Sequence, residues 1–222
     1  MRLNPKEHLE YPWLVSTLAA DFKLLDVWRY PIEIELGIPL DRFIEFAESS
    51  QGELVSKNGP AGALFRLRAI LGKVFRWDDE LETPSEALPI PGCRETSLRD
   101  RLSDAVRETQ TRPSPSSSKD RANSGFKLVY RLENESLREI SNKTVHALMH
   151  LGRVQISATH WSPQMAVYVK TRGILGRGYM ALITPFRHYI VYPAIMRAAK
   201  RGWPSYAARH RTAARGQPSP PG

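Results

Sequence analysis

Residues 126–170 read FKLVYRLENESLREISNKTVHALMHLGRVQISATHWSPQMAVYVK and carry the clearest strand pattern in the chain. Apolar and polar residues alternate in three blocks, at 126–132, 140–154 and 165–169, and this period of two is typical of half-buried strands. A turn is expected at Asn134–Glu135, between the first two blocks. Because only short links join the blocks, they predict consecutive antiparallel strands.

The segment before this run adds one more strand and several helices. Residues 22–36 alternate in the same way, and Pro31 on the polar side predicts an edge strand or a bulge. Helical spacing follows at 39–47 and again at 60–77, where an apolar stripe lies opposite a basic one. A short helix is expected near 98–106.

The chain after residue 170 predicts a long helix. Three glycines precede an apolar stretch with helical spacing, Pro193 is expected to kink the helix, and the helix is expected to end near Gly202. Together the elements predict an α+β fold. We expect one curved antiparallel sheet that grips a long C-terminal helix (a helix-grip arrangement), with two short helices after the first strand.

The composition is that of one globular domain with extensions. The chain has 222 residues, of which 41% are apolar and 25% charged, and a chain of this size can bury a core without disulfides or a metal. We expect an extended N-terminal lead-in at 1–13 and a single domain at 14–203. Within that domain, 109–125 has the Pro/Ser composition of a flexible loop, and 204–222 reads as a disordered basic tail.

The cysteine content favours a reducing compartment. The single Cys93 cannot form an intramolecular disulfide, and secreted domains usually pair their cysteines. The first 13 residues lack the apolar stretch of a signal peptide, and Arg187-His188 interrupt the most apolar stretch, 179–196. We therefore expect a cytoplasmic protein without a transmembrane segment.

Charge is distributed unevenly along the chain. Residues 1–139 hold 20 Lys/Arg and 23 Asp/Glu, whereas residues 140–222 hold 12 Lys/Arg and no acidic residue. This asymmetry is compatible with an anionic partner, such as a phospholipid surface, or with a solvated basic face and tail. The basic residues are scattered singly, which favours the second interpretation.

Several ordered segments resemble a known family. They read NKTVHALMHLG at 142–152, QMAVYVK at 164–170 and LGRGYMALITPFRHYIVYPAIMR at 175–197, preceded by ALFRLRAILG at 63–72 and FRWD at 75–78. Over roughly residues 10–203 the chain closely resembles the bacterial domain of unknown function 2867 family. The resemblance implies the helix-grip architecture of the START and polyketide-cyclase-like (SRPBCC) superfamily, whose members commonly enclose an apolar ligand cavity between sheet and helix. The family has no agreed activity, so the resemblance implies no catalytic residue.

His146 and His150 lie four residues apart in one strand block. This spacing places both on one face with their Cα atoms about 13 Å apart, too far for one metal ion, and no third ligand accompanies them, so we expect no metal site. We interpret them as hydrogen-bonded sheet residues, and the alternative is that they contact a ligand or transfer protons near neutral pH. Tyr130, in the first block, is a further ligand-binding candidate.

Arg187 and His188 interrupt an otherwise apolar helix. They form either the polar face of an amphipathic helix, together with Arg197 and Arg201, or an anchor for an anionic head group or a membrane phosphate. The first interpretation is favoured, and both residues stay candidates for ligand binding.

Motifs for the common cofactors are missing from the sequence. It contains no Gly-x-Ser-x-Gly nucleophile elbow, no Gly-Lys-Ser/Thr phosphate loop and no dinucleotide-binding fingerprint. We therefore expect no cofactor. The sequence also lacks an RNA-recognition pattern of interleaved aromatic and basic residues, so no sequence-specific nucleic-acid partner is expected.

Three functions remain open at this point. The first is the binding of a small apolar or amphipathic ligand between the sheet and the C-terminal helix. The second is a cyclase- or hydratase-like enzyme in the same place, with His146, His150 or Glu139 transferring protons. The third is an interaction module that binds an anionic membrane or partner through residues 140–222.

Overall fold

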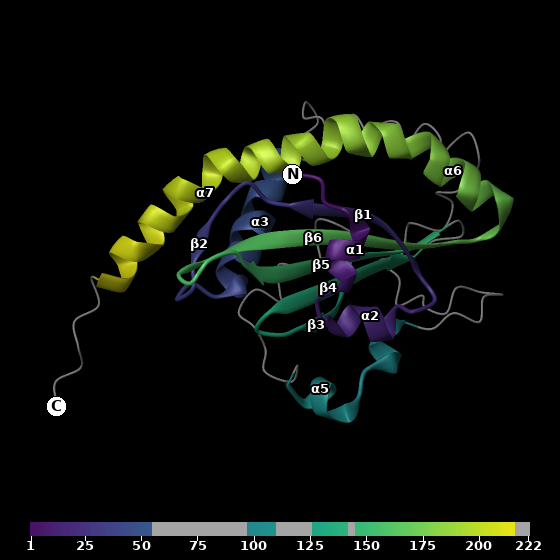
Figure 1. Cartoon of the computed structure of the whole chain (residues 1–222), viewed down its shortest axis with the longest axis horizontal. Helices are drawn as coiled ribbons and strands as arrows, with labels where there is room; N and C mark the ends of the chain where they lie inside the picture. Colours follow the sequence, from purple (N-terminus) through teal and green to yellow (C-terminus); the bar gives the residue numbers. More distant parts are fainter. Residues whose placement is uncertain (55–96, 110–125, 142–144, 216–222) are drawn as a thin grey trace.

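A computed structural model describes residues 1–54, 97–109, 126–141 and 145–215 (Figure 1). The strands in this part are β1 (Lys23–Arg29), β2 (Ile34–Glu35), β3 (Lys127–Arg131), β4 (Glu135–Ser141), β5 (Val145–Gln155) and β6 (His160–Thr171). The helical elements are α1 (Pro5–Leu9), α2 (Leu14–Leu18), α3 (Leu40–Leu54), a 3-10 turn (Leu98–Arg101), α5 (Asp104–Thr109), α6 (Gly173–Phe186), a π-helical turn (Arg187–Val191) and α7 (Tyr192–Arg215).

All strand pairs are antiparallel, as the short links predict. The order across the sheet is β1–β6–β5–β4–β3, and β2 pairs with the beginning of β6. In Figure 1, α6 and α7 form one long arch along the sheet, α1 overlaps the central strands, and α2 and α5 lie at the side away from the arch. The fold is therefore α+β, an antiparallel sheet with a long C-terminal helix, and the predicted fold class is confirmed.

The register assigns the residues of β5 and β6 to opposite faces of the sheet. Leu148 pairs with Tyr168 and packs with α2, whereas Met149 pairs with Val167 and packs toward α7. We call the first face the N-terminal face; on the central strands it carries His146, Leu148, His150, Ala166 and Tyr168. We call the second the helix-side face; on the same strands it carries Ala147, Met149, Leu151, Met165 and Val167.

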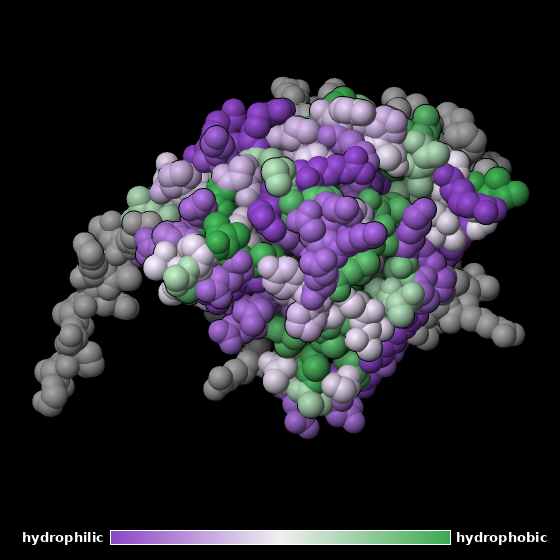
Figure 2. All heavy atoms as spheres, in the orientation of Figure 1, coloured by the Kyte–Doolittle hydropathy of each residue, from purple (hydrophilic) through white to green (hydrophobic). Residues whose placement is uncertain are grey.

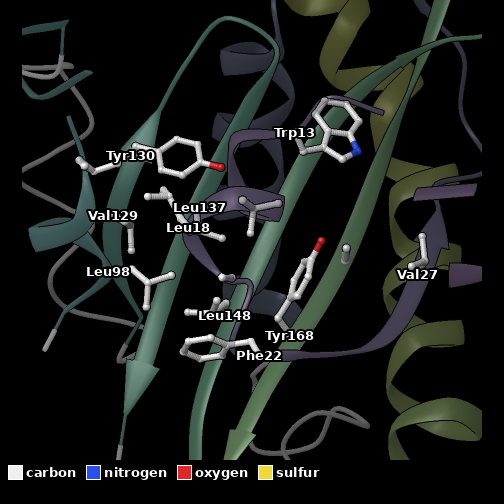
Figure 3. Close-up of a cluster of buried hydrophobic side chains, with 14 of the residues drawn as sticks. Trp13, Leu18, Phe22, Val27, Leu98, Val129, Tyr130, Leu137, Leu148 and Tyr168 are labelled. Atoms are coloured by element: carbon white, nitrogen blue, oxygen red, sulfur yellow. The ribbon is translucent and has the colours of Figure 1, made fainter. Parts of the chain in front are cut away.

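Each face has its own hydrophobic cluster. Figure 3 shows the cluster on the N-terminal face, where Trp13 and Leu18 lie over side chains of the central strands. On the helix-side face, α3 and α7 are joined by aromatic residues, and the rings of Phe46 and Trp203 lie 5.5 Å apart in an edge-to-face arrangement. Helical spacing of apolar residues in α3 presents these rings to α7.

Two β-bulges change the direction of side chains that simple alternation would assign otherwise. In β1 the register shifts between Leu24 and Asp26, so that Asp26 stands opposite Val167 on the helix-side face. In β3 the register shifts between Leu128 and Tyr130, so that Tyr130 leaves the face of Leu128 for the N-terminal face. Bulges re-aim side chains in this way without ending a strand. The single strand expected over 22–36 is broken, because β1 ends at Arg29 and β2 begins at Ile34, with Pro31 between them. The part before Pro31, β1, is an edge strand with a bulge, as expected.

The expectation of an extended N-terminal lead-in is wrong. Residues 5–9 form α1, with the Asn4 side chain accepting a hydrogen bond from the Lys6 N–H at the helix start. Leu3, His8 and Trp13 are buried, and the Leu3 N–H donates to the Val27 carbonyl over 2.9 Å. The segment is part of the domain because it covers the N-terminal face of the sheet.

The C-terminal helix is longer than expected. It does not end near Gly202: α7 continues through Pro204 to Arg215, and Ala207 is buried against α3. The first part of the expected disordered tail is therefore helical, because its alanines continue the apolar side of the helix. Residues 216–222 lie outside the described residues.

The remaining expectations divide into three groups. The helix at 39–47 is confirmed by α3, and the short helix near 98–106 by the 3-10 turn and α5. The single strand expected over 140–154 is wrong, since β4 and β5 are separate strands. The helix at 60–77, the Pro/Ser loop after Thr109 and Cys93 lie outside the described residues.

Candidate functional site

A buried hydrogen-bond network on the N-terminal face contains two of the predicted site residues. His150 Nε2 lies 2.9 Å from Glu135 Oε2, and the Tyr130 hydroxyl donates to the same oxygen over 2.6 Å. The Leu14 N–H donates to the other oxygen of Glu135 over 2.8 Å. Burial opposes ionisation of Glu135, but these hydrogen bonds outweigh it and lower the pKa of the carboxyl below its ordinary value.

His8 extends this network from α1. Its Nε2 lies 2.9 Å from the Tyr168 hydroxyl, its Nδ1 lies 2.8 Å from the side-chain nitrogen of Gln164, and its ring centre lies 5.2 Å from that of His150. The amide nitrogen of Gln164 can only donate, so His8 Nδ1 accepts and the imidazole is neutral. Burial and the nearby His150 lower the pKa of His8 to about 3, which agrees with the neutral form.

His146 belongs to a separate cluster on the same face. Its Nε2 lies 2.9 Å from Glu139 Oε2, and Glu139 also accepts from the Ser97 hydroxyl and from the Leu98 N–H. Burial opposes ionisation of Glu139, yet these hydrogen bonds together lower its pKa. His146 and His150 share a face, as their spacing predicts, but each is hydrogen-bonded to its own glutamate.

The N-terminal face is closed over these groups. His146 and His150 are 1% and 0% exposed, and the Trp13 ring covers His150 at a centroid distance of 5.1 Å. Figure 3 shows Trp13 and Tyr168 on this face, with the Tyr168 hydroxyl directed toward the tryptophan. Buried polar groups that are hydrogen-bonded in this way stabilise a fold, and here no reacting group of a substrate could approach the histidines.

Arg187 and His188 meet on the other side of the sheet, at Asp26. Arg187 and His188 both donate to this carboxylate, and the Tyr192 hydroxyl donates to it over 3.2 Å. Asp26 and Arg187 are buried, and His188 is nearly so. The π-helical turn places Arg187, His188 and Tyr192 on the inner side of the arch, where the bulge in β1 directs Asp26.

The centre of the helix-side face is apolar and only half-buried. We call Ala147, Met149, Leu151 and Val167 the sheet floor; each is partly exposed. Their neighbours on β5 and β6 that point to the N-terminal face, such as Leu148 and Ala166, are fully buried. Central strands rarely leave a contiguous apolar surface accessible unless something binds to it.

Polar groups flank the sheet floor on both sides. Toward β1 lies the Asp26 cluster. Toward β3 and β4 lie Arg131 and Arg138, both of which form ion pairs with Glu48 of α3. The pairing of Arg138 with Met149 in the register places this arginine directly beside the floor. An apolar surface with charged groups at its edges is the composition that fits an amphipathic ligand.

Three further features concern a surface pocket, metal binding and membrane spans. A surface pocket of about 260 Å³ lies between Glu33 and the Trp203–Ala208 stretch of α7, and no residue of the sheet floor lines it. Within the described ranges, no three His, Cys, Asp or Glu side chains are grouped as a metal ion would require. In the same part of the chain, no helix combines the length and the apolar character needed to cross a membrane.

Fold and site together define an α+β protein with one closed and one partly open sheet face. The family described as "Protein of unknown function (DUF2867)" matches residues 18–194, and the chain belongs to this family. No curated protein and no solved structure matches the chain. The predicted family is therefore confirmed, and its description assigns no activity.

Sequence reasoning missed the residues that hold the predicted ones in place. Glu135 was expected in a turn, and it lies at the start of β4, where it holds His150 and Tyr130. Asp26 has the same parity as Trp28, and both lie on the helix-side face, but its partners Arg187 and His188 are far away in the sequence. His8 had a usable signal, because Asn4-Pro5 is a typical helix start and would have predicted an ordered N-terminal segment.

Proposed function

We propose that this protein binds a small apolar or amphipathic ligand against the sheet floor, between the sheet and the C-terminal helix. The observation that carries the proposal is the half-buried state of the floor residues, which are Ala147, Met149 and Leu151 on β5 and Val167 on β6. A ligand that covered these side chains would remove apolar surface from water, which favours binding in proportion to the area covered.

The charged groups beside the floor support an amphipathic rather than a purely apolar ligand. Arg138 adjoins the floor through the register with Met149, and the Asp26 cluster adjoins it through the register with Val167. Polar groups at the edge of an apolar surface orient a ligand and favour one that carries a polar end. The single Cys93 supports a cytoplasmic place of action.

The enzyme alternative receives less support from the geometry. It needs His146, His150 or Glu139 to reach one shared substrate atom. These residues lie on the N-terminal face, beneath Trp13 and the 3-10 turn, and each histidine is bound to a different glutamate. The floor itself carries only apolar side chains, so binding is the function that its chemistry supports.

The test is a titration with a fluorescent apolar anion, 1-anilinonaphthalene-8-sulfonate, followed by displacement with lauric acid. We expect saturable binding of one probe per chain. Met149→Trp fills the floor and is expected to abolish the binding, and Ala147→Leu is a milder variant with a partial effect. Leu9→Trp is the matched control, because Leu9 is exposed on α1 at the opposite face.

Circular dichroism of each variant establishes that the fold is retained. Equal probe binding by the wild type, Met149→Trp and Leu9→Trp would contradict the proposal, because the probe would then bind elsewhere. If lauric acid displaces the probe but lauryl trimethylammonium does not, the result would indicate that the polar end of the ligand is anionic.

A further inference from the structure

The outer side of the arch formed by α6, the π-helical turn and α7 carries an unusual set of exposed side chains. Ile174, Leu182 and Tyr189 are 79%, 59% and 82% exposed, and Ile190 is also exposed. Large apolar side chains that are exposed together on one helical segment commonly mark a binding surface. Green spheres in Figure 2 lie over the end of the molecule where Figure 1 places α6.

Basic side chains continue this surface along α6 and α7. Arg177, Arg197, Lys200 and Arg201 are exposed, and none of them forms a salt bridge within the part of the chain that the structure describes. No acidic residue follows Glu139 in the sequence, so no carboxylate lies on the arch. Arg177, Arg197, Lys200 and Arg201 are thus four of the 12 Lys/Arg that follow Glu139, and all four are exposed on α6 and α7.

The π-helical turn places apolar side chains between the basic ones. Arg187 and Val191 face inward from the turn, while Tyr189 and Ile190 between them face outward. The sequence of exposed residues along the arch is therefore apolar and basic on α6, apolar at the turn and basic on α7. Helices that lie in the interface of a membrane combine the same two properties, with aromatic and aliphatic residues that enter it and Lys/Arg that bind lipid phosphates.

We propose that the outer side of the α6–α7 arch is a docking surface for an anionic lipid bilayer. Leu182, Tyr189 and Ile190 enter the interfacial region of the bilayer, and Arg197, Lys200 and Arg201 contact the phosphates of anionic lipids. A nucleic acid would be attracted by the basic residues alone and would leave the exposed leucine, tyrosine and isoleucine in water, so the apolar residues favour lipid. This surface is distinct from the sheet floor and does not depend on it.

The experiment is co-sedimentation of the full chain with vesicles of phosphatidylcholine, with and without phosphatidylserine, at low and high salt. We expect binding to the anionic vesicles only, and a steep loss of binding as salt screens the charges. Arg197→Glu/Lys200→Glu is expected to weaken binding by more than about 25-fold, at about fivefold for each charge lost and more for reversal. Leu182→Ser/Tyr189→Ser, which changes exposed residues only, is expected to weaken it by about tenfold or more.

The matched control is Arg99→Glu/Lys127→Glu. It changes the net charge by the same amount at exposed residues outside the arch, and it is expected to bind vesicles nearly as the wild type does. Equal losses in the control and in Arg197→Glu/Lys200→Glu would overturn the proposal, because net charge alone would then act. Absence of vesicle binding at low salt would also overturn it. So would binding to duplex DNA or RNA, if anionic vesicles do not compete with the nucleic acid and Leu182→Ser/Tyr189→Ser leaves the nucleic-acid binding unchanged.

Discussion

Leu148 and Met149 are neighbours on β5, yet they belong to surfaces with opposite properties. Leu148 points to the N-terminal face and is fully buried, whereas Met149 points to the helix-side face and is half-buried. On the N-terminal face, even the polar residues are buried, and His150 and His146 are hydrogen-bonded through Nε2 to Glu135 and Glu139. One face of the sheet is therefore closed, and the other leaves apolar side chains partly accessible to solvent.

The largest effect is expected from Glu135→Ala. The substitution removes the shared partner of three groups, the buried His150 and Tyr130 hydroxyl and the partly buried Leu14 N–H. Leaving a buried polar group without its partner costs about 1–3 kcal/mol, so with three groups affected the free energy of unfolding in urea at neutral pH should fall by about 3–5 kcal/mol. Glu133→Ala, two residues away and exposed, should change it by less than about 0.5 kcal/mol. Similar losses in the two variants would show that the network does not hold the N-terminal face.

A pair of alanine substitutions tests whether the two faces of β5 differ in how tightly they are packed. Leu148→Ala should cost about 2–5 kcal/mol, since it opens a cavity in a closed core. Met149→Ala removes a side chain that is already in contact with water and should cost less than about half as much. Chemical denaturation of both variants measures the difference. Equal costs would mean that the two faces of β5 are equally closed.

Gly152→Ala tests how tightly the N-terminal face is packed. A Cβ atom at this position would lie 2.8 Å from the Trp13 ring and 3.1 Å from the His150 ring. Overpacking of this kind costs about 1–3 kcal/mol. The control is Gly178→Ala in α6, where a Cβ would meet nothing within 4 Å and where alanine favours the helix by about 0.5–1 kcal/mol. A thermal melt should therefore move in opposite directions for the two variants.

The smallest effect concerns pH. His8 has its pKa lowered to about 3 in the folded protein, whereas an unfolded histidine titrates near 6.5, so the unfolded state binds more protons between these values. Stability due to His8 is present above pH 6.5 and is lost as the pH falls, at up to about 1.4 kcal/mol per pH unit. The lowered pKa values of Glu135 and Glu139 act in the same direction at lower pH.

The variant that isolates the contribution of His8 to the pH dependence of stability is His8→Gln. Its free energy of unfolding between pH 5 and pH 6 should change less steeply with pH than that of the wild type, whatever its absolute stability. Two parallel curves would show that His8 binds protons equally well in the folded and unfolded states.

The sequence predicts the order of the elements better than the faces of the sheet. Alternation at 126–132 and 165–169 located strands because period two is a local property of the chain, whereas the alternation at 22–36 covers two strands, β1 and β2. Alternation failed for Tyr130, because one extra residue in a bulge reverses the face of the residues beyond it, and bulges depend on the partner strand.

Only part of the candidate site could be predicted, because its contacts also depend on elements far apart in the sequence. Arg187 and His188 were recognised as polar residues in an apolar helix, but their partner Asp26 lies about 160 positions earlier in the chain. His146 and His150 were placed on one face correctly, while the direction of that face depends on where α1 and α7 pack. No local pattern specifies such tertiary contacts, and the floor residues read simply as apolar strand positions.

The most direct test of the central claim uses the five methionines of the chain as probes. Their methyl carbons can be labelled and followed by NMR during titration with lauric acid. Met149 lies on the sheet floor, whereas Met1 is 70% exposed and is hydrogen-bonded to Arg29 of β1, which β6 separates from β5. Binding at the floor predicts a saturable shift of the Met149 methyl resonance with Met1 unchanged. A Met149 resonance that stays fixed while lauric acid displaces the fluorescent probe would contradict the proposed ligand site.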